Sequence, residues 1–437
     1  MSCLRMNLMF RIWMYVGVTK MHEHIEACSS IANLLNFKHF YSAEQESRSM
    51  TKRNQVLFDS LKNLSEENGF NKKEYPYHEK ICIATNDSEK DWLKNISSSE
   101  KVCAADFEIV NVGNCFSVSY FYYSSEKYLI VSGLNDVSLD EGFEFEAINS
   151  GVFTLFSSLN LIKFKNISNN ISKVYNEILN KDPDLADPKF VDLNNIISYF
   201  EPTYICKINK EAIFYELQLD RIAAYITMAI TKDNYPNDIP VFSLIKDLII
   251  TGERSINFSY LAKAIFIKDE PYLLFMELYR MLERIYAIPT IKALKHELCI
   301  GMDSHWEIIS SIEKTTGWRK KENEGLYTLL SQLEYSILND AYNTLNKNHG
   351  DYFNNSLVIK KQKLLQDLDI KSESYSSACR ELEEAIKVCL RDYIYKTRNS
   401  YVHYREALES QLDQGKIHSL CESLLMIINP IYVKLGV

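Results

Sequence analysis

The sequence predicts a mainly α-helical protein with an N-terminal α+β region and a C-terminal antiparallel helical bundle. The chain has 437 residues but only 13 glycines and 9 prolines, so few positions interrupt helices. Between about residues 80 and 164, short runs rich in β-branched and aromatic residues replace the helical pattern. From residue 270 onward, apolar residues recur at three- and four-residue spacing, which is typical of packed helices.

The composition limits the classes of function. A content of 46% hydrophobic and 12% aromatic residues excludes a mainly disordered chain. The net charge of −9 argues against a surface that coats nucleic acid generally, so any RNA contact must be a local basic site. The ten cysteines are scattered without a C-x-x-C pair. They indicate reduced thiols in a cytoplasmic protein, and we expect neither a metal site nor a cofactor.

Residues 1–20 form a segment of their own. Their apolar run is interrupted by Arg11 and is shorter than the roughly 20 apolar residues that span a bilayer. We expect either a start codon assigned too early, with the protein beginning at Met21, or a disordered leader. No other stretch is long and apolar enough to cross a membrane.

Residues 21–165 are predicted to form an α+β domain that acts as a sensor. Two short amphipathic helices are expected before residue 68, and strands are expected afterwards. Residues 116–123 alternate in the manner of a half-buried strand, and the short Ser124-Ser125-Glu126 break predicts a hairpin into residues 127–131. Residues 166–269 read as a helical connector region, in which Asn-rich and Pro-containing breaks separate helices.

Residues 270–437 carry four apolar stripes and predict a helical bundle. The first helix begins at Glu270-Pro271 and is followed by a break at Pro289. The other three stripes run as follows: Leu326, Leu329, Leu330, Leu333, Ile337 and Ala341; Leu382, Ile386, Cys389, Tyr393 and Thr397; Leu420, Leu424, Ile427, Ile428 and Ile431.

The third of these helices runs into a motif that suggests chemistry. Arg398 and Asn399 are followed, after three residues, by His403. Arginine is a permanent cation whose planar fork suits a phosphate, and histidine can change its protonation near neutral pH. Together they could cleave a phosphodiester without a metal.

A late bundle helix with Arg398, Asn399 and His403 at this spacing resembles the HEPN superfamily, whose ribonucleases share an Arg, a polar residue and then a His. Within it, a HEPN domain at the end of a longer chain is most similar to the abortive-infection and Apea-like HEPN group of anti-phage defence. The resemblance covers only residues 270–437. One subgroup of HEPN toxins has a tyrosine two residues after the His, whereas here that position is Arg405 and the tyrosine is Tyr404.

The resemblance implies a metal-independent endoribonuclease that leaves 2′,3′-cyclic phosphate and 5′-hydroxyl ends. His403 would act as general base or acid, and Arg398 would stabilise the charge that grows on the phosphoryl oxygens. Asn399 would orient the His or bind a phosphate. We expect the neighbouring Lys396, Tyr404 and Arg405 to contact RNA, with tRNA as one candidate substrate. The toxic effector of an abortive-infection system would also have a phage-derived trigger or an antitoxin as a partner.

Helix geometry adds a prediction about assembly. Five residues turn an α-helix by about 500°, so Arg398 and His403 lie about 140° apart. We therefore expect a homodimer through the bundle, in which the Arg of one subunit approaches the His of the other. Glu283 could face this cleft and hold Arg398, or it could be an ordinary solvent-exposed acid, which we slightly prefer.

Two alternatives remain open at this point. The bundle could be a catalytically inactive HEPN module that binds RNA or mediates dimerisation and regulates a partner protein. The N-terminal region could instead be an enzyme with an unrecognised site.

Overall fold

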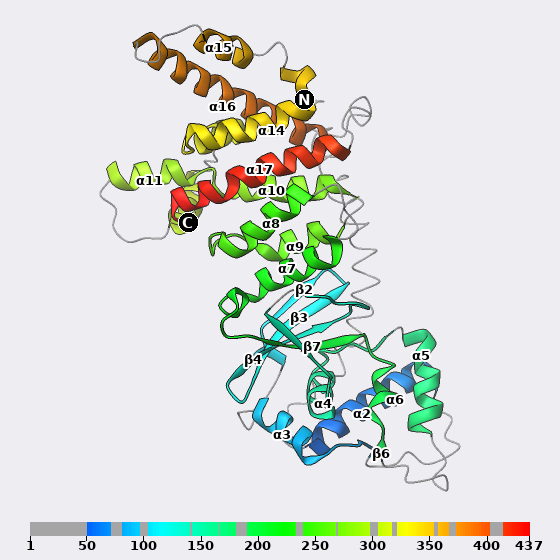
Figure 1. Cartoon of the computed structure of the whole chain (residues 1–437). Coiled ribbons are helices and arrows are strands. Elements are labelled where there is room, and N and C mark those ends of the chain that lie inside the picture. The colour runs from blue at the N-terminus through cyan, green and yellow to red at the C-terminus, as the bar shows by residue number, and fades with distance from the viewer. Residues whose placement is uncertain are drawn as a thin grey trace, which may run out of the picture. The chain divides into compact units, whose positions relative to one another are not determined.

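The protein divides into two compact units, Met1–Tyr215 and Glu216–Val437, which we describe separately. The computed structural model describes residues 50–70, 81–96, 104–139, 142–165, 167–180, 190–232, 239–267, 270–297, 305–316, 321–353, 357–366, 373–402 and 414–437. The leader, the expected start at Met21 and the first predicted helix lie outside these residues. The described chain is mainly helical, and the first unit contains an antiparallel sheet, which confirms the predicted fold class at this level (Figure 1).

The sheet of the first unit has five antiparallel strands in the order β2-β3-β4-β7-β5. Its strands are β2 (Ile109–Val112), β3 (Phe116–Tyr123), β4 (Glu126–Ser132), β5 (Phe143–Glu146) and β7 (Thr203–Ile208). The central strand β4 is the most deeply buried, and Leu129 and Val131 in it are fully inaccessible to solvent. Such burial on a central strand favours β-branched and apolar residues, as the sequence pattern indicated.

The predicted hairpin is confirmed. Strands β3 and β4 pair from Ser117 opposite Ser132 to Tyr123 opposite Glu126. The two intervening residues, Ser124 and Ser125, have φ angles of 48° and 65°. A two-residue loop with positive φ at both positions matches the right-handed twist of the flanking strands, which explains the tight connection.

Helices cover this sheet and a small second sheet lies beside them. The helices are α2 (Met50–Glu67), α3 (Asp87–Ile96), α4 (Ser150–Ser158), α5 (Ile167–Val174), extended by a π-helical turn over Tyr175–Leu179, and α6 (Leu193–Ile197). The second sheet pairs β1 (Cys82–Ile83) with β6 (Phe190–Val191) in parallel. All nine residues of α4 are buried, so α4 is the centre of the apolar core of this unit.

The pairing of strand β7 sets the C-terminal boundary of the first unit. It pairs with β4 and β5, so the sheet needs residues up to Ile208. Residues 166–215 of the predicted connector consequently belong to the sheet-containing unit, and residues 216–269 belong to the helical unit. The spacing of apolar residues carries no information on this pairing, because strand partners distant in sequence are chosen by packing.

The second unit consists of helices. They are α7 (Leu219–Lys232), α8 (Ile239–Thr251), α9 (Phe258–Phe266), α10 (Pro271–Ile285), α11 (Ile288–Glu297), α12 (His305–Thr316), α13 (Glu322–Leu330), α14 (Tyr335–Phe353), α15 (Leu357–Gln366), α16 (Glu373–Val402) and α17 (Gln414–Leu435). Helix α17 packs on α8, α10 and α14, and α16 packs on α13, α14 and α15 (Figure 1). The apolar stripe predicted on α16 is largely buried, with Ile386 fully so.

The predicted boundaries of two helices can be compared with the structure. Pro271 occupies the first turn of α10, where its missing N–H costs nothing, as predicted. The prediction of a single helix over residues 326–341 was wrong, because the structure divides this stretch between α13 and α14. The backbone N–H groups of Gln332 and Leu333 donate to carbonyls three residues earlier, which makes a tight turn between the two helices.

None of the helices in the described part of the chain combines the length and the apolar character that crossing a membrane requires.

Candidate functional site: an arginine between two carboxylates

The predicted motif lies at the C-terminal end of the 30-residue helix α16. Lys396, Arg398 and Asn399 are in its last turns, and the described helix ends at Val402. His403, Tyr404 and Arg405 lie outside the described residues, so the relation of Arg398 to His403 stays a prediction.

Arg398 is held by side chains from two other helices. Its Nη2 atom lies 3.1 Å from Oε1 of Glu322 on α13 and 4.0 Å from Oε1 of Glu283 on α10. Its guanidinium carbon is 5.6 Å from the ring centroid of Tyr279, also on α10. Only 16% of the side-chain surface of Arg398 is exposed. The guanidinium is thereby fixed at the meeting point of α10, α13 and α16.

The neighbouring Asn399 shares in this arrangement. Nη1 of Arg398 donates a hydrogen bond of 3.1 Å to Oδ1 of Asn399. The Nε atom of Arg398 is buried and has no hydrogen-bond partner among the described residues. Lys396, by contrast, is exposed and lies about 200° around the helix from Arg398. An RNA contact made by Lys396 would therefore be on a different side of α16.

Two buried tyrosines lie beneath the carboxylates. The hydroxyl of Tyr279 donates to Oε2 of Glu322 over 3.3 Å, and the rings of Tyr279 and Tyr286 meet edge to face. Burial raises the pKa of both phenols above the ordinary value, so both stay protonated near neutral pH. Tyr279 is therefore a permanent hydrogen-bond donor to Glu322.

Charge in the cluster is not balanced. Two carboxylates, Glu283 and Glu322, share one guanidinium. Burial, followed by the nearby charge of Glu322, raises the pKa of Glu283, although Arg398 acts in the opposite direction. A carboxyl group whose pKa is raised in this way holds a proton more readily, which suits it to accept and donate protons.

Close packing sets the distance between α13 and α10. A Cβ atom added at Gly325, one turn after Glu322, would lie 2.5 Å from Cγ of Tyr286. Only glycine allows α13 to approach Tyr286 this closely. Gly325 therefore positions Glu322 in front of Arg398.

Aromatic side chains anchor the last turn of α16. The ring of Tyr401 stacks on Tyr272 at a centroid distance of 5.4 Å and lies 6.2 Å from Phe275. Both partners are on α10. The segment that leads to His403 is thus held against the same helix that supplies Glu283 and Tyr279.

The sequence predicted some of these residues and missed others. Glu283 does face Arg398, so our preference for an ordinary solvent-exposed acid was wrong, although 40% of its side chain is exposed. Tyr279, Glu283 and Tyr286 follow each other at four- and three-residue spacing on one face of α10, which could have indicated this. No local signal pointed to Glu322 or Gly325, since their roles depend on the packing of α13 on α10.

Comparisons of the chain with protein-family models, with curated proteins and with solved structures find no match. The resemblance to HEPN ribonucleases therefore stands on the sequence motif alone.

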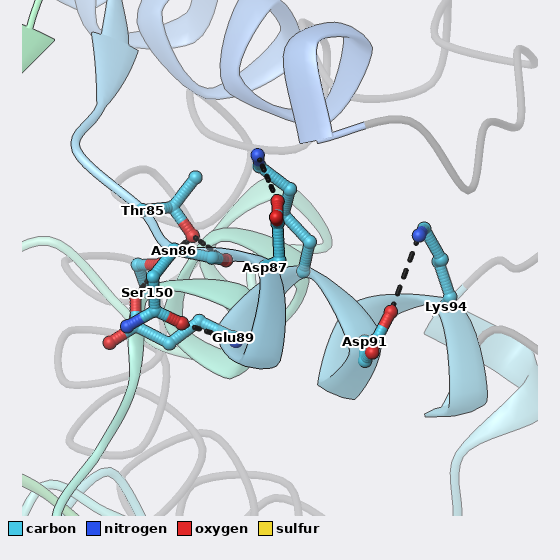
Figure 2. A network of polar contacts seen from close by, with 8 residues as sticks. Thr85, Asn86, Asp87, Glu89, Asp91, Lys94 and Ser150 are labelled. Carbon is cyan, nitrogen blue, oxygen red and sulfur yellow. Dashed lines mark hydrogen bonds and ion pairs between the residues drawn. The ribbon is translucent and has the colours of Figure 1, made fainter.

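A second polar cluster lies in the first unit, between α3 and α4. The hydroxyl of Ser150 donates to Oε2 of Glu89 over 2.6 Å, and its oxygen also lies 2.6 Å from the hydroxyl oxygen of Thr85. Figure 2 shows these three side chains gathered at the start of α3, while Asp87 and Asp91 form separate ion pairs with Lys90 and Lys94. Ser150 is fully buried, so a substrate cannot reach its hydroxyl. We interpret this cluster as a polar link between two helices.

Within the described ranges, no three or more His, Cys, Asp or Glu side chains are grouped so that they could hold a metal ion.

Proposed function

We propose that the helical unit is a metal-independent endoribonuclease of the HEPN type and the toxic effector of an anti-phage abortive-infection system. The observation that carries the proposal is the position of Arg398. It is fixed by α10 and α13 at the end of α16, five residues before His403. A guanidinium that is already oriented loses little entropy when it binds a phosphoryl group.

The proposed reaction needs one group to take the proton of the 2′-hydroxyl and one to protonate the leaving 5′-oxygen. The 2′-oxygen attacks the adjacent phosphorus, the bond to the 5′-oxygen breaks, and the products are a 2′,3′-cyclic phosphate and a 5′-hydroxyl. His403 serves as one of the two proton carriers. Glu283 is suited to the other role, because its pKa is raised and it faces Arg398. Arg398 stabilises the negative charge on the phosphoryl oxygens.

Substrate must compete with the carboxylate of Glu322 for the guanidinium of Arg398. The pair is partly open to solvent, with 29% of the Glu322 side chain exposed, and such pairs are worth little net energy. A phosphodiester carries one negative charge, as a carboxylate does, so it displaces Glu322 only when further contacts hold the RNA at the site. The proposal includes a homodimer in the cytoplasm, in which the second copy completes the site, and a first unit that senses the trigger.

A second candidate function is favoured by the same ion pairs. Since Glu283 and Glu322 already compensate the charge of Arg398, the motif could serve only to hold α16 in place. The unit would then be an inactive module that binds RNA or mediates dimerisation.

Cleavage of total RNA and of tRNA by the purified full chain separates the two candidates. The first candidate predicts fragments with cyclic phosphate ends, and it predicts that His403→Ala lowers the rate at least about 100-fold. His296→Ala, which changes an exposed histidine on α11, is the matched control and should leave the rate unchanged. Equal cleavage by His403→Ala and the unchanged chain would refute the ribonuclease proposal. Sedimentation of the active species tests the dimer, since an active strict monomer contradicts it.

A further inference from the structure

A second feature of the helical unit lies beside α10, at Glu277, Arg280 and Arg284. It is a hollow of about 350 Å³. Residues of α10 form one wall, Asn257 and Tyr260 of the α9 segment form another, and Tyr432 of α17 closes it. The volume is at the lower end of the range of about 300–1,000 Å³ that small-molecule sites occupy.

Two arginines one helical turn apart line this hollow. Arg284 is held in place, because its Nη1 donates to the carbonyl of Ser255 over 3.2 Å and its guanidinium lies 5.0 Å from the ring of Trp306. Arg280 has 63% of its side chain exposed. Residues four apart on a helix lie side by side, so the two forks can grip one anionic group. Planar guanidinium groups match phosphate geometry especially well.

An aromatic ring lies at the rim of the hollow. Tyr260 is 53% exposed, and the ammonium group of Lys263 is 5.3 Å from its ring centroid. An exposed ring on a structured helix, beside cations, is a stacking surface for a nucleobase. The arginines and this ring thus offer places for a phosphate and for a flat ring system.

A buried carboxyl group completes the lining. Glu277 is only 8% exposed, and the one ion pair that it makes in the described structure is to Arg280, over 3.4 Å. Burial raises its pKa, while Arg280 and Lys263 partly offset this effect. A carboxyl group at this position accepts hydrogen bonds from hydroxyl or amino groups and disfavours a ligand that is anionic throughout. The lining therefore suits a ligand with one anionic end and a hydrogen-bond-donating remainder.

We propose that this hollow binds a nucleoside monophosphate, with the phosphate between Arg280 and Arg284, the base on Tyr260 and a ribose hydroxyl or base amino group on Glu277. The hollow is too small for a dinucleotide or a longer strand to be enclosed. This inference does not depend on the ribonuclease proposal, since the ion pairs of Arg398 are to Glu283 and Glu322 and to none of the residues that line the hollow.

Calorimetric titration of the full chain tests the proposal. The probes are AMP, GMP, CMP and UMP, with adenosine, inorganic phosphate and a five-nucleotide single-stranded RNA as comparison ligands. At least one monophosphate is expected to bind, and at least tenfold more tightly than inorganic phosphate or adenosine.

Variants assign the binding to the hollow. Arg280→Ala and Arg284→Ala are each expected to weaken binding of the monophosphate at least tenfold, because each removes a charge-assisted contact. Tyr260→Ala is expected to weaken it about tenfold through loss of stacking, while Tyr260→Phe retains it. Arg380→Ala, which removes an exposed arginine on α16, is the matched control and should have no effect. Arg280 and Tyr260 are exposed, so their replacement leaves the core intact.

Three results would overturn the proposal. The first is that none of the four monophosphates binds. The second is that they bind equally well to the Arg280, Arg284 and control variants. The third is that inorganic phosphate or the RNA strand binds as tightly as the best monophosphate, which would indicate a general anion surface. A normal melting temperature of each variant shows that a loss of binding does not come from unfolding.

Discussion

The Nη2 atom of Arg398 lies 3.1 Å from Oε1 of Glu322, although the two residues belong to different helices and are distant in the sequence. Most of the surface of both side chains is buried, and Tyr279 donates a further hydrogen bond to Glu322. The pair therefore links α13 to the end of α16, where the proposed chemistry takes place.

Replacing Arg398 by alanine should destabilise the helical unit moderately. The change leaves Glu283 and Glu322 side by side without a cation and removes the hydrogen bond to Asn399. We expect a loss of about 1–2 kcal/mol in the free energy of unfolding, because the cluster is partly exposed. Urea denaturation measures it. A double-mutant cycle with Glu322→Gln should give a coupling above 0.5 kcal/mol, and strict additivity would contradict the pairing.

The stability of the protein should depend on pH through Glu283. Its pKa in the folded state is raised above the ordinary value of 4.5, so the folded state binds the proton more tightly than the unfolded state. This contribution therefore stabilises the fold at low pH and is lost as the pH rises from about 4.5 through the folded-state pKa. Glu283→Gln should be increasingly more stable than the unchanged chain over that interval. A difference in unfolding free energy that does not vary between pH 4 and pH 7 would count against this assignment.

Replacing Gly325 by alanine should displace α13 from α10. The new Cβ atom would lie within 2.5–2.8 Å of three atoms of Tyr286, which cannot give way because Tyr286 is buried. Overpacking of this kind costs about 1–3 kcal/mol. Thermal unfolding measures it, with Glu324→Ala on the exposed side of α13 as the control. If the ribonuclease proposal holds, Gly325→Ala should also lower the cleavage rate, since Glu322 moves relative to Arg398.

Arg221 should be the most costly arginine to remove from the described part of the helical unit. It is 4% exposed, donates to the carbonyls of Ile249 and Gly252 at the end of α8, and lies 4.6 Å from the ring of Phe258. Arg221→Ala leaves two buried carbonyls without donors and opens a cavity, so we expect a loss of about 3–5 kcal/mol. Chemical denaturation tests this. The exposed Arg254→Ala should change stability by less than about 0.5 kcal/mol, and a similar loss in both variants would contradict the prediction.

Short-range sequence patterns predicted helices and strands correctly where residues close together in the sequence determine the structure. The Ser124-Ser125 hairpin, the start of α10 at Pro271 and the buried stripe of α16 all follow from residues that lie close together in sequence. The prediction was wrong over residues 326–341, where a continuous apolar stripe spans a turn. The apolar stripe continues through the turn between α13 and α14, because Leu333 lies in that turn and is buried, at 7% exposure.

The sequence by itself determined the mainly helical class, the antiparallel hairpin and the Arg398-Asn399 motif, because short-range periodicity and residue chemistry suffice for these. Only the tertiary structure decided that β7 completes the first sheet and that Glu283, Glu322 and Tyr279 surround Arg398. These relations join segments far apart in the chain. They depend on how closely helices and strands can approach, as the contact of Gly325 with Tyr286 illustrates, and no local pattern encodes that distance.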